Sequence, residues 1–119
     1  MFFSSTELDL IDHSINQFNS YVDKMSAVER STVNQELNSI RIRLVNKTTT
    51  KEDIPLLTYC VAYRSKLIEA AMQMATLTGL TPYAESLRRL HRRFEEEARL
   101  ARVELQEPDF SAILQKFTK

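Results

Sequence analysis

Apolar residues recur along this chain at the three- and four-residue spacing of α-helices, in segments separated by short polar stretches. The segment from residue 54 to residue 78 is the most apolar of them. At 100° per residue, its apolar positions cover roughly 220° of the helix surface, whereas a surface helix usually has an apolar stripe of about 100°. A helix of this kind must be covered on two or more sides. We therefore expect it to lie at the centre of a bundle or in an oligomer interface.

Two helices are predicted before this segment, over residues 5–25 and 27–46. Each begins at a capping box, formed by Ser4 with Glu7 and by Ser26 with Glu29. The apolar positions are Leu8, Ile11, Ile15, Phe18, Val22 and Met25 in the first helix, and Val33, Leu37, Ile40 and Leu44 in the second. The connection between the two helices is short, which makes them antiparallel neighbours.

The remaining boundaries follow from turn-forming residues. Thr50 and Asp53 are expected to cap the third helix, and Gly79, the only glycine, is expected to end it. A fourth helix is predicted over residues 82–107, between two prolines, and a short final helix over residues 109–117.

These segments predict a single all-α domain over residues 1–119, an antiparallel up-down-up-down four-helix bundle with a short C-terminal helix. Hydrophobic content of 43% and charged content of 27% are typical of a soluble globular protein. Charged residues interrupt the third helix before about 18 uncharged apolar residues accumulate, so we expect no membrane association. The chain starts without a basic region followed by an apolar run, and the expected compartment is the cytoplasm.

Composition and motifs give little support for catalysis or metal binding. Cys60, the single cysteine, lies in the apolar third helix and is expected to be a buried, inert thiol. His13 and His91 belong to different predicted helices, and neither stands in the Glu-x-x-His spacing of di-metal helical bundles. The chain also lacks a Gly-x-Ser-x-Gly elbow and a glycine-rich phosphate loop. We therefore expect no enzyme activity, no metal and no cofactor.

Arg64 interrupts the apolar surface of the third helix, and two interpretations are open. In the first, its methylene stem packs in the core and its guanidinium reaches a carboxylate on a neighbouring helix. In the second, the guanidinium binds an anionic small molecule in a partly closed pocket, with Tyr59 and Tyr63 nearby.

The fourth helix contains an arginine-rich block, from residue 88 to residue 93, in which Arg88 and Arg92 share one flank with Arg99. These residues are candidates for phosphate contacts in nucleic acid. They also have a structural explanation, because same-helix pairs are available: Arg92 with Glu96, Arg93 with Glu97, and Glu95 with Arg99. The first helix is acidic and is expected to neutralise part of this block if the two helices adjoin. A formal net charge of +0 makes the nucleic-acid interpretation the weaker one.

The leading functional hypothesis comes from surplus apolar surface, which four helices of this length do not cover easily. The candidate partner interface consists of Leu67, Met74, Leu100, Val103, Phe110, Ile113, Leu114 and Phe117. We expect a small non-enzymatic regulatory, adaptor or chaperone-like protein that acts by helix-mediated association with a protein partner or a second copy. An inhibitor, an immunity protein or an antitoxin fits the same pattern. The alternatives are a nucleic-acid-binding regulator and a binder of small anions around Arg64.

Overall fold

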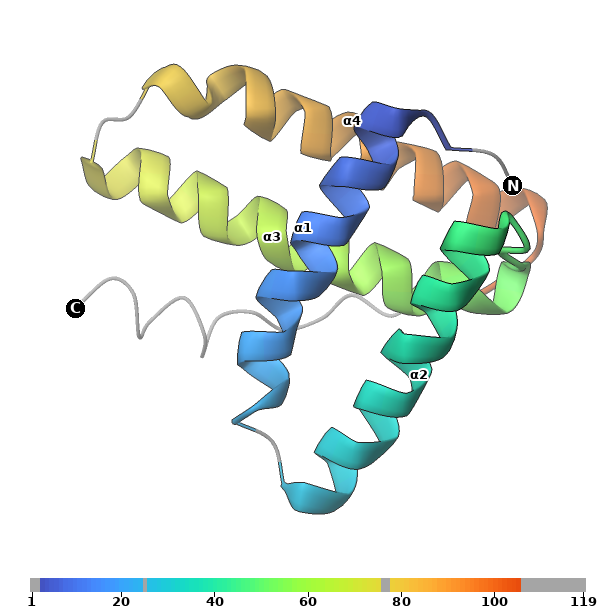
Figure 1. The fold of residues 1–119 in the computed structure, drawn as a ribbon. Helices are drawn as coiled ribbons and strands as arrows, with labels where there is room; N and C mark the ends of the chain where they lie inside the picture. The colour runs from blue at the N-terminus through green and yellow to red at the C-terminus, as the bar shows by residue number, and fades with distance from the viewer. Residues whose placement is uncertain (1–2, 25, 76–77, 106–119) are drawn as a thin grey trace.

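The computed structural model describes residues 3–24, 26–75 and 78–105, and the side chains of residues 74, 75 and 78 are not described. Its elements are α1 (Ser5–Val22), α2 (Ala27–Asn46), the 3₁₀ turn η1 (Lys51–Asp53), α3 (Ile54–Ala75), the 3₁₀ turn η2 (Thr78–Leu80) and α4 (Thr81–Leu100) (Figure 1). Every regular element within these ranges is helical, which confirms the all-α class.

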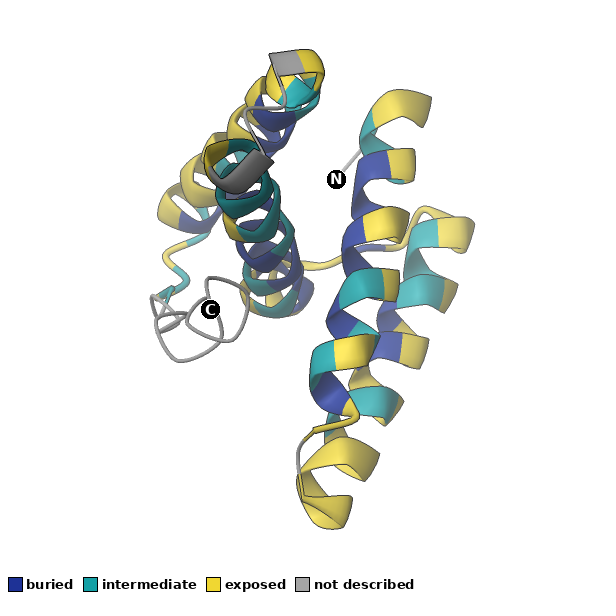
Figure 2. Cartoon of the chain, turned by 90° about the vertical axis from the view of Figure 1, so that its left-hand side faces the viewer, coloured by how far each residue is buried: buried dark blue, intermediate teal, exposed yellow. Residues whose placement is uncertain are grey.

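The helices form two antiparallel hairpins, α1–α2 and α3–α4, that cross at a steep angle (Figures 1 and 2). α3 packs against both α4 and α1, whereas α2 packs mainly against α1. The four helices therefore do not line up along one axis as an up-down-up-down bundle would. α1 makes the main helix contact between the two hairpins, through α3.

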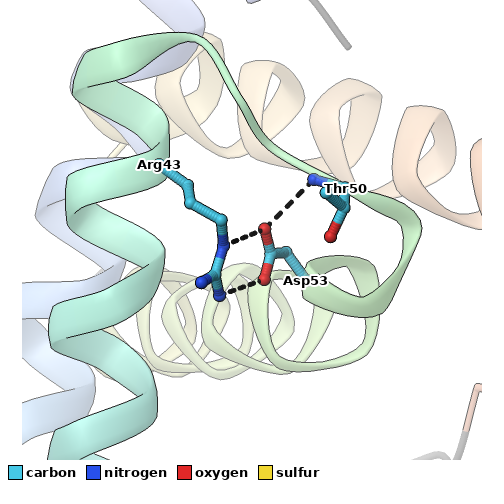
Figure 3. A network of polar contacts seen from close by, with 3 residues as sticks. All are labelled: Arg43, Thr50 and Asp53. Atoms are coloured by element: carbon cyan, nitrogen blue, oxygen red, sulfur yellow. Dashed lines mark hydrogen bonds and ion pairs between the residues drawn. The ribbon is translucent and has the colours of Figure 1, made fainter.

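The segment between α2 and α3 sets the crossing of the hairpins. Lys47 takes a left-handed conformation with φ of 59°, and the backbone N–H of Thr48 donates to the carbonyl of Arg43 (2.9 Å). Asp53, in η1, is buried and accepts hydrogen bonds from the Arg43 guanidinium and from the backbone N–H of Thr50 (3.1 Å), as Figure 3 shows. These contacts fix the conformation of the backbone between α2 and α3, so that α3 leads away from α2 and does not run back beside it. Thr50 and Asp53 thus form the cap expected before the third helix.

Helix starts agree with the sequence better than helix ends. The capping box of Ser4 and Glu7 is present, and the Ser26 hydroxyl accepts from the backbone N–H of Glu29 (3.3 Å). α1 ends at Val22 rather than at residue 25, because the backbone N–H of Lys24 donates to the carbonyl of Tyr21 (3.1 Å), three residues back, and the chain turns.

The prediction that the fourth helix runs to residue 107 was wrong. α4 ends at Leu100, because Arg102 adopts a left-handed φ of 56° and the backbone N–H of Val103 donates to the carbonyl of Ala98 (2.8 Å). This 6→1 hydrogen bond is that of a Schellman motif. Gly79 was also assigned wrongly, since it lies in η2 without the positive φ of a C-cap glycine. The helix predicted over residues 109–117 lies outside the described residues.

The core lies where α1 crosses α3 and α4. Its largest fully buried side chains are Phe94, Ile11, Ile15, Leu37, Ile54, Leu57 and Leu87. The first half of α3 is the most buried, with Val61 fully covered, whereas the apolar residues from Leu67 to Met72 are only half-buried. The expectation that the third helix is covered on several sides therefore holds for its N-terminal half alone.

Candidate functional site

α2 carries apolar residues on two opposite sides, and only one side is covered. Leu37 and Ile40 are buried against α1. On the far side, three large apolar side chains are exposed to solvent: Val28 (79%), Ile42 (61%) and Val45 (81%). Figure 2 shows the exposed residues that follow the outside of this hairpin and cover its tip. Exposed apolar residues gathered on one helix face are typical of an interaction surface.

The exposed apolar residues belong to a regular stripe, which we call the α2 seam. It consists of Val28, Ser31, Gln35, Asn38, Ile42 and Val45, all of which are exposed. Successive members are three or four residues apart in strict alternation, which is the a/d spacing of a coiled coil. None of them is charged. A seam of this kind can receive a second helix along its length.

The apolar periodicity of the sequence does not reveal this seam. A search for apolar periodicity finds the stripe that contains Leu37 and Ile40, because that stripe is apolar throughout. The outer stripe is apolar at its ends and polar in the middle. The signal that would have revealed it is a second stripe of uncharged positions, separated from the apolar stripe by the charged residues of the helix.

A groove with a volume of about 370 Å³ lies between α1 and α2, beside the seam. Its lining consists of Leu8, Ile15, Leu44 and Val45, with Asp9, Asp12 and Arg41 as the charged members. Arg41 donates from Nη2 to the side-chain oxygen of Asn16 (2.7 Å). Its Nε is buried and has no hydrogen-bond partner among the described residues. The groove thus extends the uncovered surface from α2 to the acidic side of α1.

The structure describes the side chains of three of the interface residues predicted from the sequence. Leu67 and Val103 are half-buried against the core, whereas Leu100 is 64% exposed. The side chain of Met74 lies outside the described part of the chain, and so do the other predicted residues, Phe110, Ile113, Leu114 and Phe117. Of the described members of the set, Leu100 is therefore the one that is exposed.

Arg64 has neutral partners in place of the expected carboxylate. Its Nε donates to the hydroxyl of Tyr83 (3.0 Å), and its Nη1 donates to the side-chain oxygen of Gln17. The guanidinium carbon lies 5.3 Å from the centroid of the Tyr83 ring. Arg64 thereby ties α3 to both α1 and α4, which is a structural role. It lines neither the groove between α1 and α2, described above, nor the one beside Pro55 and Tyr59.

The two tyrosines expected beside Arg64 belong to an aromatic cluster between α1 and α3. The rings of Tyr59 and Tyr63 lie 5.3 Å and 5.8 Å from the ring of Phe18. Burial, followed by the neighbouring Tyr21, raises the pKa of Tyr59 to about 12. Burial likewise raises the pKa of the Cys60 thiol to about 12, so little thiolate forms near neutral pH.

Carboxylates neutralise much of the arginine-rich part of α4. Arg88 Nε lies 3.1 Å from Glu69 Oε1 of α3, and Arg99 pairs with Glu96 one turn away. Arg99 thus pairs within its own helix, with Glu96 where the sequence predicted Glu95. Arg92 is exposed, and no ion pair is found for it within residues 78–105 or elsewhere in the described chain. Of the predicted phosphate contacts on this helix, Arg88 and Arg99 therefore have their charge matched already.

Arg93 pairs with Glu7, as expected if the acidic first helix adjoins the fourth. The Arg93 Nη1 to Glu7 Oε2 distance is 2.5 Å, and the Arg93 guanidinium carbon lies 4.9 Å from the centroid of the Phe3 ring. Burial by itself would raise the pKa of Glu7. The hydrogen bonds from Arg93 and from the backbone of Ser4 outweigh it, and the pKa is lowered. The start of α1 is thus fastened to the middle of α4.

Comparison of the chain with protein-family models, with curated proteins and with solved structures found no match. None of the helices in the described ranges has the length and apolar character needed to cross a membrane. The same residues contain no group of three or more His, Cys, Asp or Glu side chains arranged to hold a metal ion. Functional inference therefore rests on the surface of the molecule, and above all on α2.

Proposed function

We propose that this chain is a small non-enzymatic interaction protein, of the regulatory or adaptor type, that acts through helix-mediated association. The observation that carries the proposal is the α2 seam, a charge-free stripe along an exposed helix in a chain with 27% charged residues. An exposed helix face normally carries charged residues, because they keep it solvated. A helix face without charges is suited to contact with another helix.

The groove between α1 and α2 supports the same proposal. It joins the C-terminal end of the seam through Val45, which lines both. Leu8, Ile15 and Leu44 give it an apolar lining, and Asp9 and Asp12 supply acidic groups beside it. Together the two features form one surface over both helices of the hairpin. The helix expected at residues 109–117 and a cytoplasmic location remain parts of the proposal, the latter in keeping with a free, buried Cys60.

A photo-reactive amino acid placed at Ile42 tests this function in the native host. If the α2 seam is an interaction surface, irradiation of cells will crosslink the chain that carries the photo-reactive amino acid at position 42 to its partner, as one discrete adduct. The same amino acid at Glu85, an exposed residue of α4, is the matched control and should give no such adduct. The mass of the adduct distinguishes a second copy, at about twice 13.8 kDa, from another protein. Absence of an adduct at Ile42, or the same adducts at both positions, would contradict the proposal.

The contacts of arginines in α3 and α4 weaken the two alternative functions. A ridge that binds phosphate needs cations with unmatched charge, and Arg88 and Arg99 are paired with Glu69 and Glu96. A pocket for small anions needs a guanidinium with free donors facing a cavity, whereas Arg64 already donates to Tyr83 and Gln17. Association through α2 is the function with direct support from the surface.

A further inference from the structure

We infer that the partner of the α2 seam is a second copy of this chain, bound through an antiparallel pair of α2 helices related by a two-fold axis. The inference rests on the proposed function, since it names the partner of the same surface. Four observations support it: the spacing of the seam, its lack of charge, its register, and the position of α2 in the fold.

The spacing of the seam matches that of helices that pair along their length. Steps of three and four residues keep a stripe facing its partner when two helices wind around each other with a left-handed twist. The seam follows these steps without a break from Val28 to Val45, which is nearly the whole of α2. The side of α2 that contacts α1, with Leu37 and Ile40, lies on the opposite face. A second helix can therefore pair with α2 without displacing α1.

The lack of charge on the seam suits contact between identical surfaces. When a surface meets its own copy, a charged residue near the centre of the contact meets a like charge, which repels it. The charged residues of α2 are Glu29, Arg30, Glu36, Arg41 and Arg43. At 100° per residue they all lie about 90° or more from the centre line of the seam. A different partner would more often be selected by charges placed along the contact.

The register of the seam is symmetric about the middle of α2. Turning a second helix end for end brings each seam residue opposite another seam residue. The facing pairs are Val28 with Val45, Ser31 with Ile42, and Gln35 with Asn38. Valines thus close both ends of the contact. In the middle, two side-chain amides face each other, and each has both donors and acceptors. Polar residues at such central positions fix the register of paired helices, at some cost in stability.

The position of α2 in the fold favours the antiparallel direction. The C-terminal end of α2 lies beside α3 and is joined to η1 by the Arg43–Asp53 ion pair, whereas the hairpin tip projects away from α3 and α4 (Figure 1). A parallel pair of α2 helices would bring the α3–α4 hairpins of the two molecules together at the same end. In an antiparallel pair, the α3–α4 hairpin of each molecule lies beyond the tip of the α1–α2 hairpin of the other. α2 is also about 30 Å long, so the contact is at the small end of stable interfaces, below about 1,200 Å².

Sedimentation of the purified chain over a range of concentrations is the first test. We expect a reversible dimer with a dissociation constant on the order of tens of micromolar, because the contact is small and polar at its centre. The variant Q35K/N38K places lysines opposite lysines and should weaken the dimer by about tenfold or more. The variant Q35K/N38E should restore it, because lysine then faces glutamate in an antiparallel pair. In a parallel pair this second variant would still place like charges together.

Disulfide trapping tests the register directly. In a Cys60→Ser background, a mixture of the Val28→Cys and Val45→Cys chains should form the mixed disulfide in preference to either symmetric one. Preferential 28–28 pairing would show a parallel arrangement and overturn the inference. Dimerisation that Q35K/N38K leaves unchanged would also overturn it, as would a monomer up to about 200 µM, a concentration well above the expected constant. Circular dichroism on each variant confirms that the helices are retained.

The two proposals fail in different ways. If the purified chain stays monomeric while the probe at Ile42 gives an adduct with another protein in cells, the self-pairing is wrong and helix-mediated association stands. If the purified chain is monomeric and the probe gives no adduct, both are wrong. An adduct at twice the mass of the chain, together with the mixed disulfide, supports both.

Discussion

At the scale of single residues, two helices end at a residue with an unfavourable backbone conformation. Lys47 and Arg102 both have a positive φ, which the Cβ atom of an L-residue disfavours. Each is followed by a 6→1 hydrogen bond, from Thr48 to Arg43 and from Val103 to Ala98. In other proteins glycine usually occupies this position. The surrounding contacts therefore hold these two residues in place against their local preference.

This conformation predicts a reversal of the usual order of alanine and glycine. At position 47, Lys47→Gly should be more stable than Lys47→Ala by roughly 1 kcal/mol, because glycine adopts the left-handed conformation without strain. At Ser39, an exposed interior position of the same helix, Ser39→Ala should instead be more stable than Ser39→Gly by about 1 kcal/mol. Urea unfolding of the four variants measures both differences. The same order at both positions would contradict the assignment of Lys47.

At the scale of elements, the contact of α1 with α4 depends on an ionised carboxylate. Glu7 has a lowered pKa in the folded state, where it accepts from Arg93. A group of this kind adds stability above its unfolded pKa, and the contribution is lost as pH falls through its folded pKa. The contribution of Glu7 should therefore be complete at neutral pH and should disappear in acid, below the ordinary value of 4.5.

The variant Glu7→Gln tests this contribution. Wild type should have the higher free energy of unfolding at neutral pH, and the difference between the two proteins should shrink as the pH falls below about 4.5. Urea titrations at a series of pH values measure it. In an Arg93→Gln background, the same Glu7→Gln change should have a smaller pH-dependent effect. A difference that stays constant down to pH 2 would show that the ion pair does not act in this way.

The sequence predicted the elements of this fold well and their arrangement poorly. Capping-box sequences beginning at Ser4 and Ser26 located the starts of α1 and α2, because such sequences are local and chemically specific. The early end of α4 was missed, since arginine is an uncommon choice for the left-handed conformation of Arg102. The α2 seam was missed because its centre is polar. The left-handed residue that ends α4 and the uncharged stripe of α2 do not alter the pattern of apolar residues, so a reading of that pattern does not find them.

At the scale of the whole molecule, one buried carboxylate connects the two hairpins. Asp53 is 2% exposed, and it joins Arg43 of α2 to the start of α3 (Figure 3). The crossing of the hairpins could not be read from the sequence, because it depends on the path from Lys47 to Asp53. If the residues from Lys47 to Asp53 formed a simple reversal of the chain, α3 would run antiparallel to α2 and beside it.

The variant Asp53→Ala should change the position of one hairpin relative to the other, and not only the conformation of η1. Loss of the cap to Thr50 alone lowers the free energy of unfolding by about 1 kcal/mol, and the loss of the acceptor for Arg43 adds to that effect. Spin labels at Ser20 of α1 and Arg89 of α4, both exposed, should report a broader distribution of distances between the hairpins. Glu52→Ala, in the same turn but exposed, is the control. An equal effect of the two substitutions would refute this role of Asp53.

The central place of α1 has a consequence for how the protein is made. α1 leaves the ribosome before the other three helices, yet its largest contacts are with α3, and its first turn is paired with Arg93 in the middle of α4. During translation only α2 is available to it at first, and α2 covers one side. The nascent chain therefore keeps the other apolar side of α1 open to water until the second hairpin has been synthesised. The core around α1 can therefore form only after α3 and α4 have left the ribosome.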